Sequence, residues 1–198
     1  GYMKARYIRD WLKGSSANTY NTWNEIKVVN KAGVNVALNK SVSANSAFYG
    51  GGSGATITDN DIYTYVQIAG TTPATHNYVQ VDLGQVHYDI DYIQVWHSYS
   101  DGRTFYGTKT EISEDGVTWK TIFDSAVEGT YKETSGGKVH TTKLTDLVKN
   151  VTTTADALKN FTDTAFKDGI VDRSESVAIE KYKNSLNESM SKAEASFA

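Results

Sequence analysis

Two stretches of the chain, YVQVDLG at residues 78–84 and DYIQVWH at residues 91–97, alternate apolar and polar side chains. The apolar positions recur at every second residue: Val79, Val81 and Leu83 in the first stretch, Ile93 and Val95 in the second. Successive side chains of a β-strand point to opposite faces of the sheet, so this period predicts two strands that each bury one face.

A hairpin is predicted further along the chain. The segment SEDGVTW at residues 113–119 places Asp115-Gly116 between two more alternating runs, TKTEIS and VTWKTIF. Glycine tolerates the positive φ that tight hairpin turns require. Similar short runs, separated by glycines and without a helical period, fill the chain from Ala5 to about Leu144. A series of short strands is typical of a sandwich or barrel, and we expect a mainly β jelly roll over residues 1–144.

The pattern changes at Leu144, where glycine nearly disappears and apolar residues recur at helical spacing. The first set is Leu144, Val148, Val151, Ala155, Leu158 and Ala165, and the second is Ile179, Tyr182, Leu186, Met190, Ala193 and Phe197. Between the sets, Gly169 is suited to end one helix, and Asp172 with Glu175 can form a capping box for the next. Residues 145–198 are therefore predicted to form a helical hairpin or paired coiled-coil segments.

The predicted helices need something to pack against. Their apolar seams are narrow, and Thr152–Thr154 weaken the first helix because β-branched side chains lose rotamer freedom there. A short helix of this kind is not stable alone. It must pack on the sandwich, on its partner helix or on copies of itself, so a homo-oligomer held by these helices is one expected arrangement.

The composition excludes several classes of partner. The chain has 20 Lys and Arg against 23 Asp and Glu, a net charge of -3, and its basic residues are scattered, so we expect no nucleic-acid partner. No apolar run approaches the roughly 18 residues that cross a bilayer, so we expect no membrane insertion. The chain has no cysteine, and any metal must therefore be held by oxygen or His.

Catalytic motifs are also missing from the sequence. The four histidines lack metalloprotease spacing, and there is no Gly-x-Ser-x-Gly elbow. The glycine-rich run YGGGSGA at residues 49–55 lacks the Lys-Ser/Thr ending of a phosphate-binding loop. We therefore expect a binding protein rather than an enzyme.

The segment ITDND, with Thr64 just beyond it, is the candidate metal site. Asp59, Asp61 and Thr64 can supply hard oxygen ligands together with backbone carbonyls, which is what Ca²⁺ prefers. The alternative is plain turn chemistry, because Asp and Asn also favour turns by bonding to nearby backbone groups.

The segment WHSYSDGRTFYG at residues 96–107 is the candidate saccharide site. Sugars present apolar C–H faces and a rim of hydroxyls, so a shallow site needs an aromatic platform beside planar donors and acceptors. Five residues of this segment supply those types: His97, Tyr99, Asp101, Arg103 and Tyr106. The segment SSANTYNTW adds Asn18, Tyr20, Asn21 and Trp23, and Phe48 with Tyr49 can join them. We expect Trp11, Trp96 and Trp119 to point into the core instead.

Five segments occur in an order and spacing that resemble one known family. They are NVALNKSVSA (35–44), ITDNDIYTYVQI (57–68), YVQVDLG (78–84), IDYIQVWH (90–97) and TEISEDGVTWKTI (110–122). Together they resemble the discoidin family, which includes the coagulation factor V/VIII C-type domains and the family 32 carbohydrate-binding modules. The resemblance implies a galactose-binding-like jelly-roll β-sandwich that binds a saccharide without catalysis.

The order of segments departs from the family pattern at its end. The family closes with an Arg-Tyr-Ile-Arg strand and a Glu-Ile strand, whereas ARYIRDW and NEIKVV stand at the front of this chain. Either the chain is a circular permutant, or residues 1–30 are the tail of a preceding tandem copy. We favour permutation because no second Arg-Tyr-Ile-Arg segment follows Leu144, which would leave the KVHTTKL strand with an unpaired edge.

The resemblance also bears on calcium. In the family, the loop that matches ITDND binds structural calcium together with a Glu from the closing strand, and Glu25 stands at the matching place here. Asn60 occupies a position where the family commonly has Gly. Permutation would therefore bring Glu25 to Asp59, Asp61 and Thr64.

The C-terminal segment AFKDGIVDRSESVAIEKYKNSL resembles helical segments of phage tail and baseplate proteins from Gram-positive hosts. We therefore expect a carbohydrate-binding module of a virion or extracellular protein that recognises a cell-wall or surface saccharide, with other tail proteins as further partners. The alternatives are an adhesion module of a secreted bacterial protein or glycosidase, and a structural spacer without a ligand.

Overall fold

The computed structural model describes residues 1–142, 144–165 and 173–195. The chain divides into two compact units, Tyr2–Thr141 and a second unit of Thr142–Ala198 with Gly1. The sequence predicted a boundary after Leu144. Each unit is described by itself.

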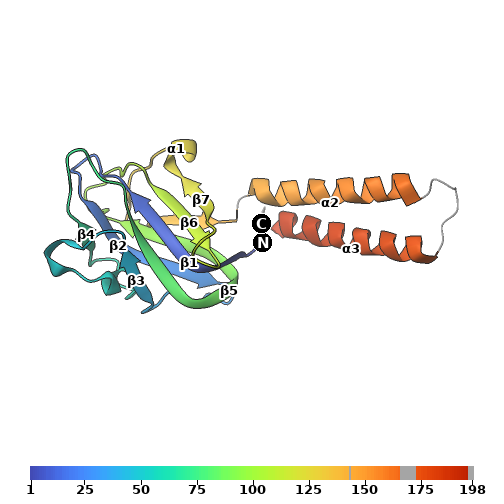
Figure 1. Cartoon of the computed structure of the whole chain (residues 1–198), viewed down its shortest axis with the longest axis horizontal. Helices are drawn as coiled ribbons and strands as arrows, with labels where there is room; N and C mark the ends of the chain where they lie inside the picture. Colours follow the sequence, from blue (N-terminus) through green and yellow to red (C-terminus); the bar gives the residue numbers. More distant parts are fainter. Residues whose placement is uncertain (143, 166–172, 196–198) are drawn as a thin grey trace. The chain divides into compact units, whose positions relative to one another are not determined.

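The regular structure of the first unit consists mainly of antiparallel strands (Figure 1). The strands are β1 (Met3–Leu12), β2 (Asn21–Asn30), β3 (Ser41–Ala44), β4 (Val66–Ile68), β5 (Asn77–His97), β6 (Lys109–Ser113), β7 (Lys120–Asp124) and β8 (Lys138–Thr141). Two short 3₁₀ helices, η1 (Tyr49–Gly51) and η2 (Gly54–Ile57), and the single-turn helix α1 (Ser125–Glu128) lie in the connections. The mainly β prediction is confirmed.

Strand β5 connects two groups of strands, here called the two arms of the sheet: β1 and β3 on one side, β2 and β8 on the other. Its first half pairs with β1 and β3, where Val81 lies opposite Ile8 and Val42, and its second half pairs with β2 and β8, where Ile93 lies opposite Val28. The prediction of two separate strands was wrong here, because the 21-residue β5 continues through the intervening segment. Gly84 has a φ of 84°, a left-handed conformation that glycine adopts without strain. Figure 1 shows that the ribbon of β5 is curved.

One hydrophobic core lies between the two arms. The alternating residues predicted from the sequence belong to it: Val79, Val81 and Leu83 from the first half of β5, and Ile93 and Val95 from the second. Strand β1 adds Ile8 and Leu12, and β2 adds Ile26 and Val28. A strand buries every second side chain against a single layer, which is why the period-two pattern predicted these positions correctly.

The predicted orientation of the tryptophans was right for one residue of three. Trp96 is buried, and its indole N–H donates to the Ser135 carbonyl at 2.9 Å. Trp11 and Trp119 are half-buried and lie outside the core. Trp11 alternates with the buried Leu12 on β1, so it points to the outer face, where its indole donates to Glu111 at 2.7 Å.

The N-terminal segment lies inside the sheet that later strands form. Strand β1 lies between β5 and β6, and β2 lies between β4 and β5. Strands β1 and β2 are therefore part of this sheet.

The second unit contains two helices, α2 (Leu144–Ala165) and α3 (Arg173–Ala195). They pack on each other, with Phe161 and Tyr182 in ring contact at 5.3 Å between centroids. The expected helical C-terminal part is confirmed, and α2 continues through Thr152–Thr154. Gly169, Asp172 and Phe197 lie outside the described residues.

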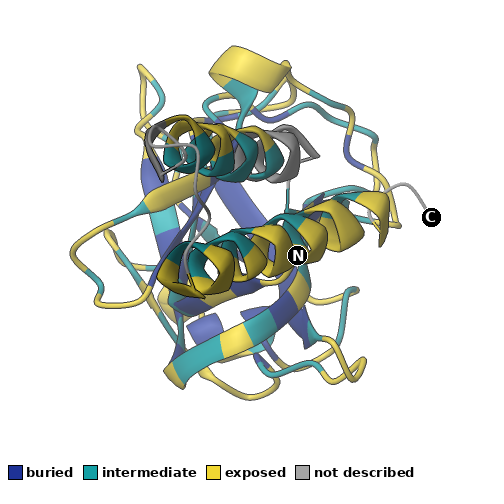
Figure 2. Cartoon of the chain, turned by 90° about the vertical axis from the view of Figure 1, so that its right-hand side faces the viewer, coloured by how far each residue is buried: buried dark blue, intermediate teal, exposed yellow. Residues whose placement is uncertain are grey.

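No described side chain of α3 is buried, as Figure 2 shows by colour. Ile179, Tyr182, Leu186 and Ala193 are half-buried along one stripe, whereas Met190, which we placed in the same seam, is 44% exposed. The contact stripe therefore includes Ser189 in place of Met190.

Candidate functional site

The two segments predicted separately as saccharide loops form one surface. The Lys13 N–H donates to the Tyr106 carbonyl at 2.7 Å, and the Tyr106 N–H donates to the Gly14 carbonyl at 2.9 Å. The Ser16 N–H donates to the Thr104 carbonyl at 2.8 Å. These three backbone bonds hold residues 13–16 against residues 104–106.

Asp101 and Arg103 form the main polar feature of this surface. The Arg103 Nε and one terminal nitrogen donate to the two Asp101 carboxylate oxygens, each at 2.9 Å. This paired guanidinium lowers the pKa of Asp101. The Arg103 side chain is 16% exposed and that of Asp101 is 48% exposed, so the carboxylate is the more accessible half. The guanidinium keeps further N–H groups beyond the two it uses here, because arginine has five.

Aromatic rings lie on the same loops. Tyr106 is 46% exposed and Tyr99 is half-buried. Tyr20 meets the exposed Tyr49 edge to face, with centroids 5.6 Å apart. Asn18 shapes the first loop, because its side-chain oxygen accepts the Tyr20 N–H at 3.0 Å. Tyr49 thus lies beside the predicted loop residues, while Phe48 packs against the core.

His97 and Trp23 do not belong to this surface. Both are fully buried, so neither can contact a saccharide at the surface, and the prediction of direct ligand contact is corrected for them. The Trp23 indole donates to Asp10 Oδ2 at 2.9 Å. His97 Nε2 contacts the same oxygen at 2.7 Å, and its Nδ1 contacts Glu133 Oε1 at 2.6 Å.

His97 is therefore a buried cation between two carboxylates. Burial alone lowers the pKa of His97, but the charges of Glu133 and Asp10 outweigh it and raise the pKa to about 10. Both ring nitrogens carry protons at neutral pH and donate to the two carboxylates. The Thr110 hydroxyl donates a hydrogen bond to the other carboxylate oxygen of Asp10, Oδ1, at 2.7 Å.

Sequence reasoning missed Asp10 and Glu133. They lie 87 and 36 residues from His97 along the chain, so no local pattern joins them. The one available signal was Asp10 at an inward position of the alternating β1, where a carboxylate requires a buried partner.

The acidic loop shows the predicted turn chemistry. Asp59 accepts the Asp61 N–H at 2.9 Å, and Asp61 accepts the Tyr63 N–H at 2.9 Å. Asn60 has a φ of 69°, and Asn is one of the few residues other than Gly that adopt this conformation readily. The residue that departs from the family pattern is thus compatible with the turn. Thr64 and Asp59 are exposed on this loop, and Tyr63 and Tyr65 beside them are 82% and 61% exposed.

Glu25 lies near this loop with a buried carboxyl group. Its side chain is fully buried, and neither carboxylate oxygen has a hydrogen-bond partner among the described residues. Burial raises the pKa of Glu25 to about 8; the nearby Asn60 N–H opposes this rise, and the charge of Asp59 adds to it. The neighbouring Asn24 donates to the Ile62 carbonyl at 2.9 Å, but its own buried side-chain oxygen is also unpaired within the described structure.

Three unpaired oxygens from Asn24 and Glu25 thus lie at the strand side of the acidic loop. Leaving a buried carboxylate without a partner is costly, and a bound cation removes that cost. These hard oxygens fit Ca²⁺ in type. In the part of the chain that the structure describes, no three His, Asp or Glu side chains are grouped as metal ligands, so a cation here also needs amide, hydroxyl or backbone oxygens. Asn24 was not predicted from the sequence.

The remaining observations concern the whole chain. No described helix combines the length and the apolarity needed to cross a bilayer. Comparison of the chain with family models, with curated proteins and with solved structures gave no match.

Proposed function

We propose that the chain is a non-catalytic carbohydrate-binding module that recognises a cell-surface saccharide. The binding surface consists of Asn18, Tyr20, Tyr99, Asp101, Arg103 and Tyr106. The observation that supports this proposal is the interlocking of residues 13–16 with residues 104–106, which brings the two candidate segments together. We also propose that the β unit is a circularly permuted, discoidin-like jelly roll.

The chemistry of the surface suits a sugar. Tyr106 offers a partly exposed ring for the C–H face of a pyranose. Asp101 and Arg103 offer planar acceptors and donors already held in place by their mutual bonds, so little side-chain entropy is lost on binding. Such a shallow site binds weakly, and avidity from several linked copies would raise the overall affinity.

The proposal includes a structural Ca²⁺ at the acidic loop. Glu25 and Asn24 would hold it from β2, and Asp59, Asp61 and Thr64 would have to close on them from the loop, because the described carboxylates are not grouped as one ligand set. The supporting observation is the buried Glu25 carboxylate, whose two oxygens have no partner among the described residues. The ion would neutralise this carboxylate and fix the loop to β2.

The helical unit supports attachment to other copies or to other tail proteins. In α3 no described side chain is buried, so the helix pair gains little stability by itself. We place the parent protein on a virion, as part of a phage tail or baseplate, or outside the cell. There are two alternative functions. The first is an adhesion module of a secreted bacterial protein or glycosidase, and the second is a structural spacer without a ligand.

A glycan array with the full chain tests the function. We expect binding to a small set of related saccharides, and weaker binding of Arg103→Ala to all of them. Arg6→Ala is the matched control, because Arg6 forms a similar two-bond pair with Asp82 at 2.9 and 3.1 Å away from the loops. Absence of any glycan binding would favour the spacer.

A further inference from the structure

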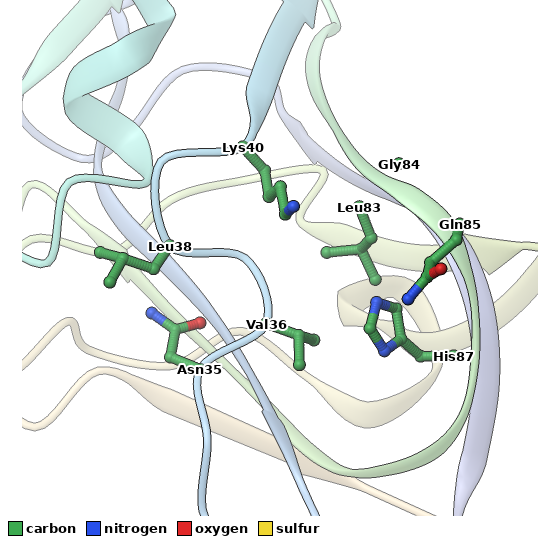
Figure 3. Close-up of a pocket in the computed structure, with 8 residues that line it drawn as sticks. All are labelled: Asn35, Val36, Leu38, Lys40, Leu83, Gly84, Gln85 and His87. Atoms are coloured by element: carbon green, nitrogen blue, oxygen red, sulfur yellow. The ribbon is translucent and has the colours of Figure 1, made fainter.

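A separate cavity of about 530 Å³ lies between the segment that follows β2 and the bend of β5 (Figure 3). Asn35, Val36, Leu38 and Lys40 line it from the first segment, and Leu83, Gly84, Gln85 and His87 line it from β5. Its volume is in the range of small-molecule sites.

The cavity and the loops described above lie at different positions along β5. The loop surface adjoins the ends of β5 at Asn77 and His97, whereas the cavity adjoins its middle, from Leu83 to His87. The loops at 13–20 and 98–107 contribute no lining residue. A ligand here would therefore bind independently of Arg103 and Tyr106.

The lining combines polar donors with apolar walls. Figure 3 shows Lys40 from one segment and Gln85 and His87 from β5 extending into the space between them. Val36 is half-buried beside the same space, whereas the Leu83 side chain is 1% exposed and belongs to the core beneath it.

The charge around the cavity is positive. Lys40 supplies an ammonium group, and no carboxylate is found among the described lining residues. The nearest carboxylate of β5, Asp82, is held by two bonds from Arg6, and this pairing lowers its pKa. The charge of Lys40 also contributes to lowering the pKa of Asp82, so an incoming anion would share the Lys40 ammonium with this carboxylate.

Hydrogen bonds hold the backbone of both lining segments in place. The Asn35 side-chain oxygen accepts the Val28 N–H at 3.0 Å and the Ala37 N–H at 3.1 Å, which anchors the first segment to β2. On the other side, the Gly84 N–H donates to Asp82 at 2.8 Å. A preformed site loses less entropy on binding than a mobile one.

We propose that this cavity binds a small acidic sugar, one that carries a carboxylate on a pyranose ring. The carboxylate contacts the Lys40 ammonium, ring hydroxyls bond to Gln85 and His87, and the apolar face of the ring packs on Val36. The class of ligand follows from the positive charge, the amide and imidazole groups and the apolar wall.

The test is a titration of the ¹⁵N-labelled full chain with D-glucuronate, followed by NMR. We expect weak, saturable binding whose shift changes centre on Gly84, Gln85 and Val36, and a much weaker response to D-glucose. Lys40→Gln should weaken glucuronate binding about tenfold, the size of one charge-assisted hydrogen bond. Lys31→Gln is the matched control, since Lys31 is exposed in the same connection and does not line the cavity.

The outcomes separate the possible explanations. Absence of saturable shifts at these residues, or equal affinity in wild type and Lys40→Gln, would overturn the proposal. Equal shifts with inorganic phosphate would show that only an anion is recognised and would overturn the sugar part. Arg103→Ala should leave glucuronate binding unchanged, so failure of the loop site and failure of this cavity are distinguishable.

Discussion

The Glu133 N–H donates to the Arg103 carbonyl at 2.9 Å, while the Glu133 carboxylate holds His97 in the interior. One residue thus connects the buried Asp10, His97 and Glu133 group to the exposed Arg103 loop. An isolated bridge between Thr104 and Lys132 adds a second attachment. The interior network supports the loop surface from beneath, which is the role that the structure assigns to His97 in place of ligand contact.

Removing the charge of Glu133 should destabilise the first unit. Glu133→Gln keeps the shape of the side chain but replaces a charged acceptor with a neutral one, and we expect a loss of about 2 kcal/mol in the free energy of unfolding. Chemical denaturation measures it. Glu114→Gln is the control, because Glu114 pairs with Lys4 at the surface and should change little. Equal effects of the two variants would contradict the network.

The same network predicts a pH dependence. The folded-state pKa of His97 is raised from 6.5 to about 10, so its contribution to stability is complete below pH 6.5 and is lost as the pH rises toward 10. The melting temperature should therefore fall between pH 7 and pH 9.5. His97→Gln should flatten this part of the curve, and a wild-type curve no steeper than that of the variant would rule out a buried imidazolium.

Bound Ca²⁺ should offset the loss of stability that ionisation of the buried Glu25 causes. The pKa of Glu25 is raised to about 8, so without a cation its ionisation reduces stability as the pH rises through that value. With chelator at pH 9, Glu25→Gln should therefore melt above wild type. Added Ca²⁺ should raise the melting temperature of wild type and leave that of the variant unchanged.

The exposed carboxyl variant Asp91→Asn is the control for the calcium experiment, and it should respond to Ca²⁺ as wild type does. If the wild-type melting temperature is the same in Ca²⁺ and in chelator, the proposed Ca²⁺ site is wrong.

The helix pair should depend on the contact between Phe161 and Tyr182. Phe161→Ala removes a half-buried ring from the contact between α2 and α3, at an expected cost of about 1–2 kcal/mol to the helical unit. Far-ultraviolet circular dichroism at 222 nm should show the helical signal melting at a lower temperature. Val177→Ala, at a 65% exposed position of α3, should leave it unchanged.

Local patterns predicted the elements of the fold. Alternation identified the buried face of β5, and Asp115-Gly116 does form the turn between β6 and β7, where Asp115 accepts the Val117 and Thr118 N–H groups at 2.8 Å. Alternation with the buried Ile8 and Leu12 places Trp11 on the outward face of β1, so its assignment to the core together with Trp96 was wrong. Alternation could not show that β5 is continuous, since its middle residues are polar or exposed.

The candidate site was harder to predict than the fold. The residues from Tyr99 to Tyr106 were selected for their aromatic and planar polar side chains, and the structure places them in the connection after β5. His97 and Trp23 have the same chemistry as surface ligands, and only their contacts with Asp10 distinguish them from such ligands. Those contacts join segments far apart in the sequence, so they depend on tertiary structure.

The most direct measurement of saccharide binding by the loop surface is calorimetric titration of the best array glycan into three forms of the full chain. The forms are wild type, Tyr106→Ala and Tyr88→Ala, since Tyr88 is 66% exposed at the bend of β5, away from the loops. We predict that Tyr106→Ala weakens binding about tenfold or more and that Tyr88→Ala binds as wild type does. Equal affinity of wild type and Tyr106→Ala would contradict the proposed surface.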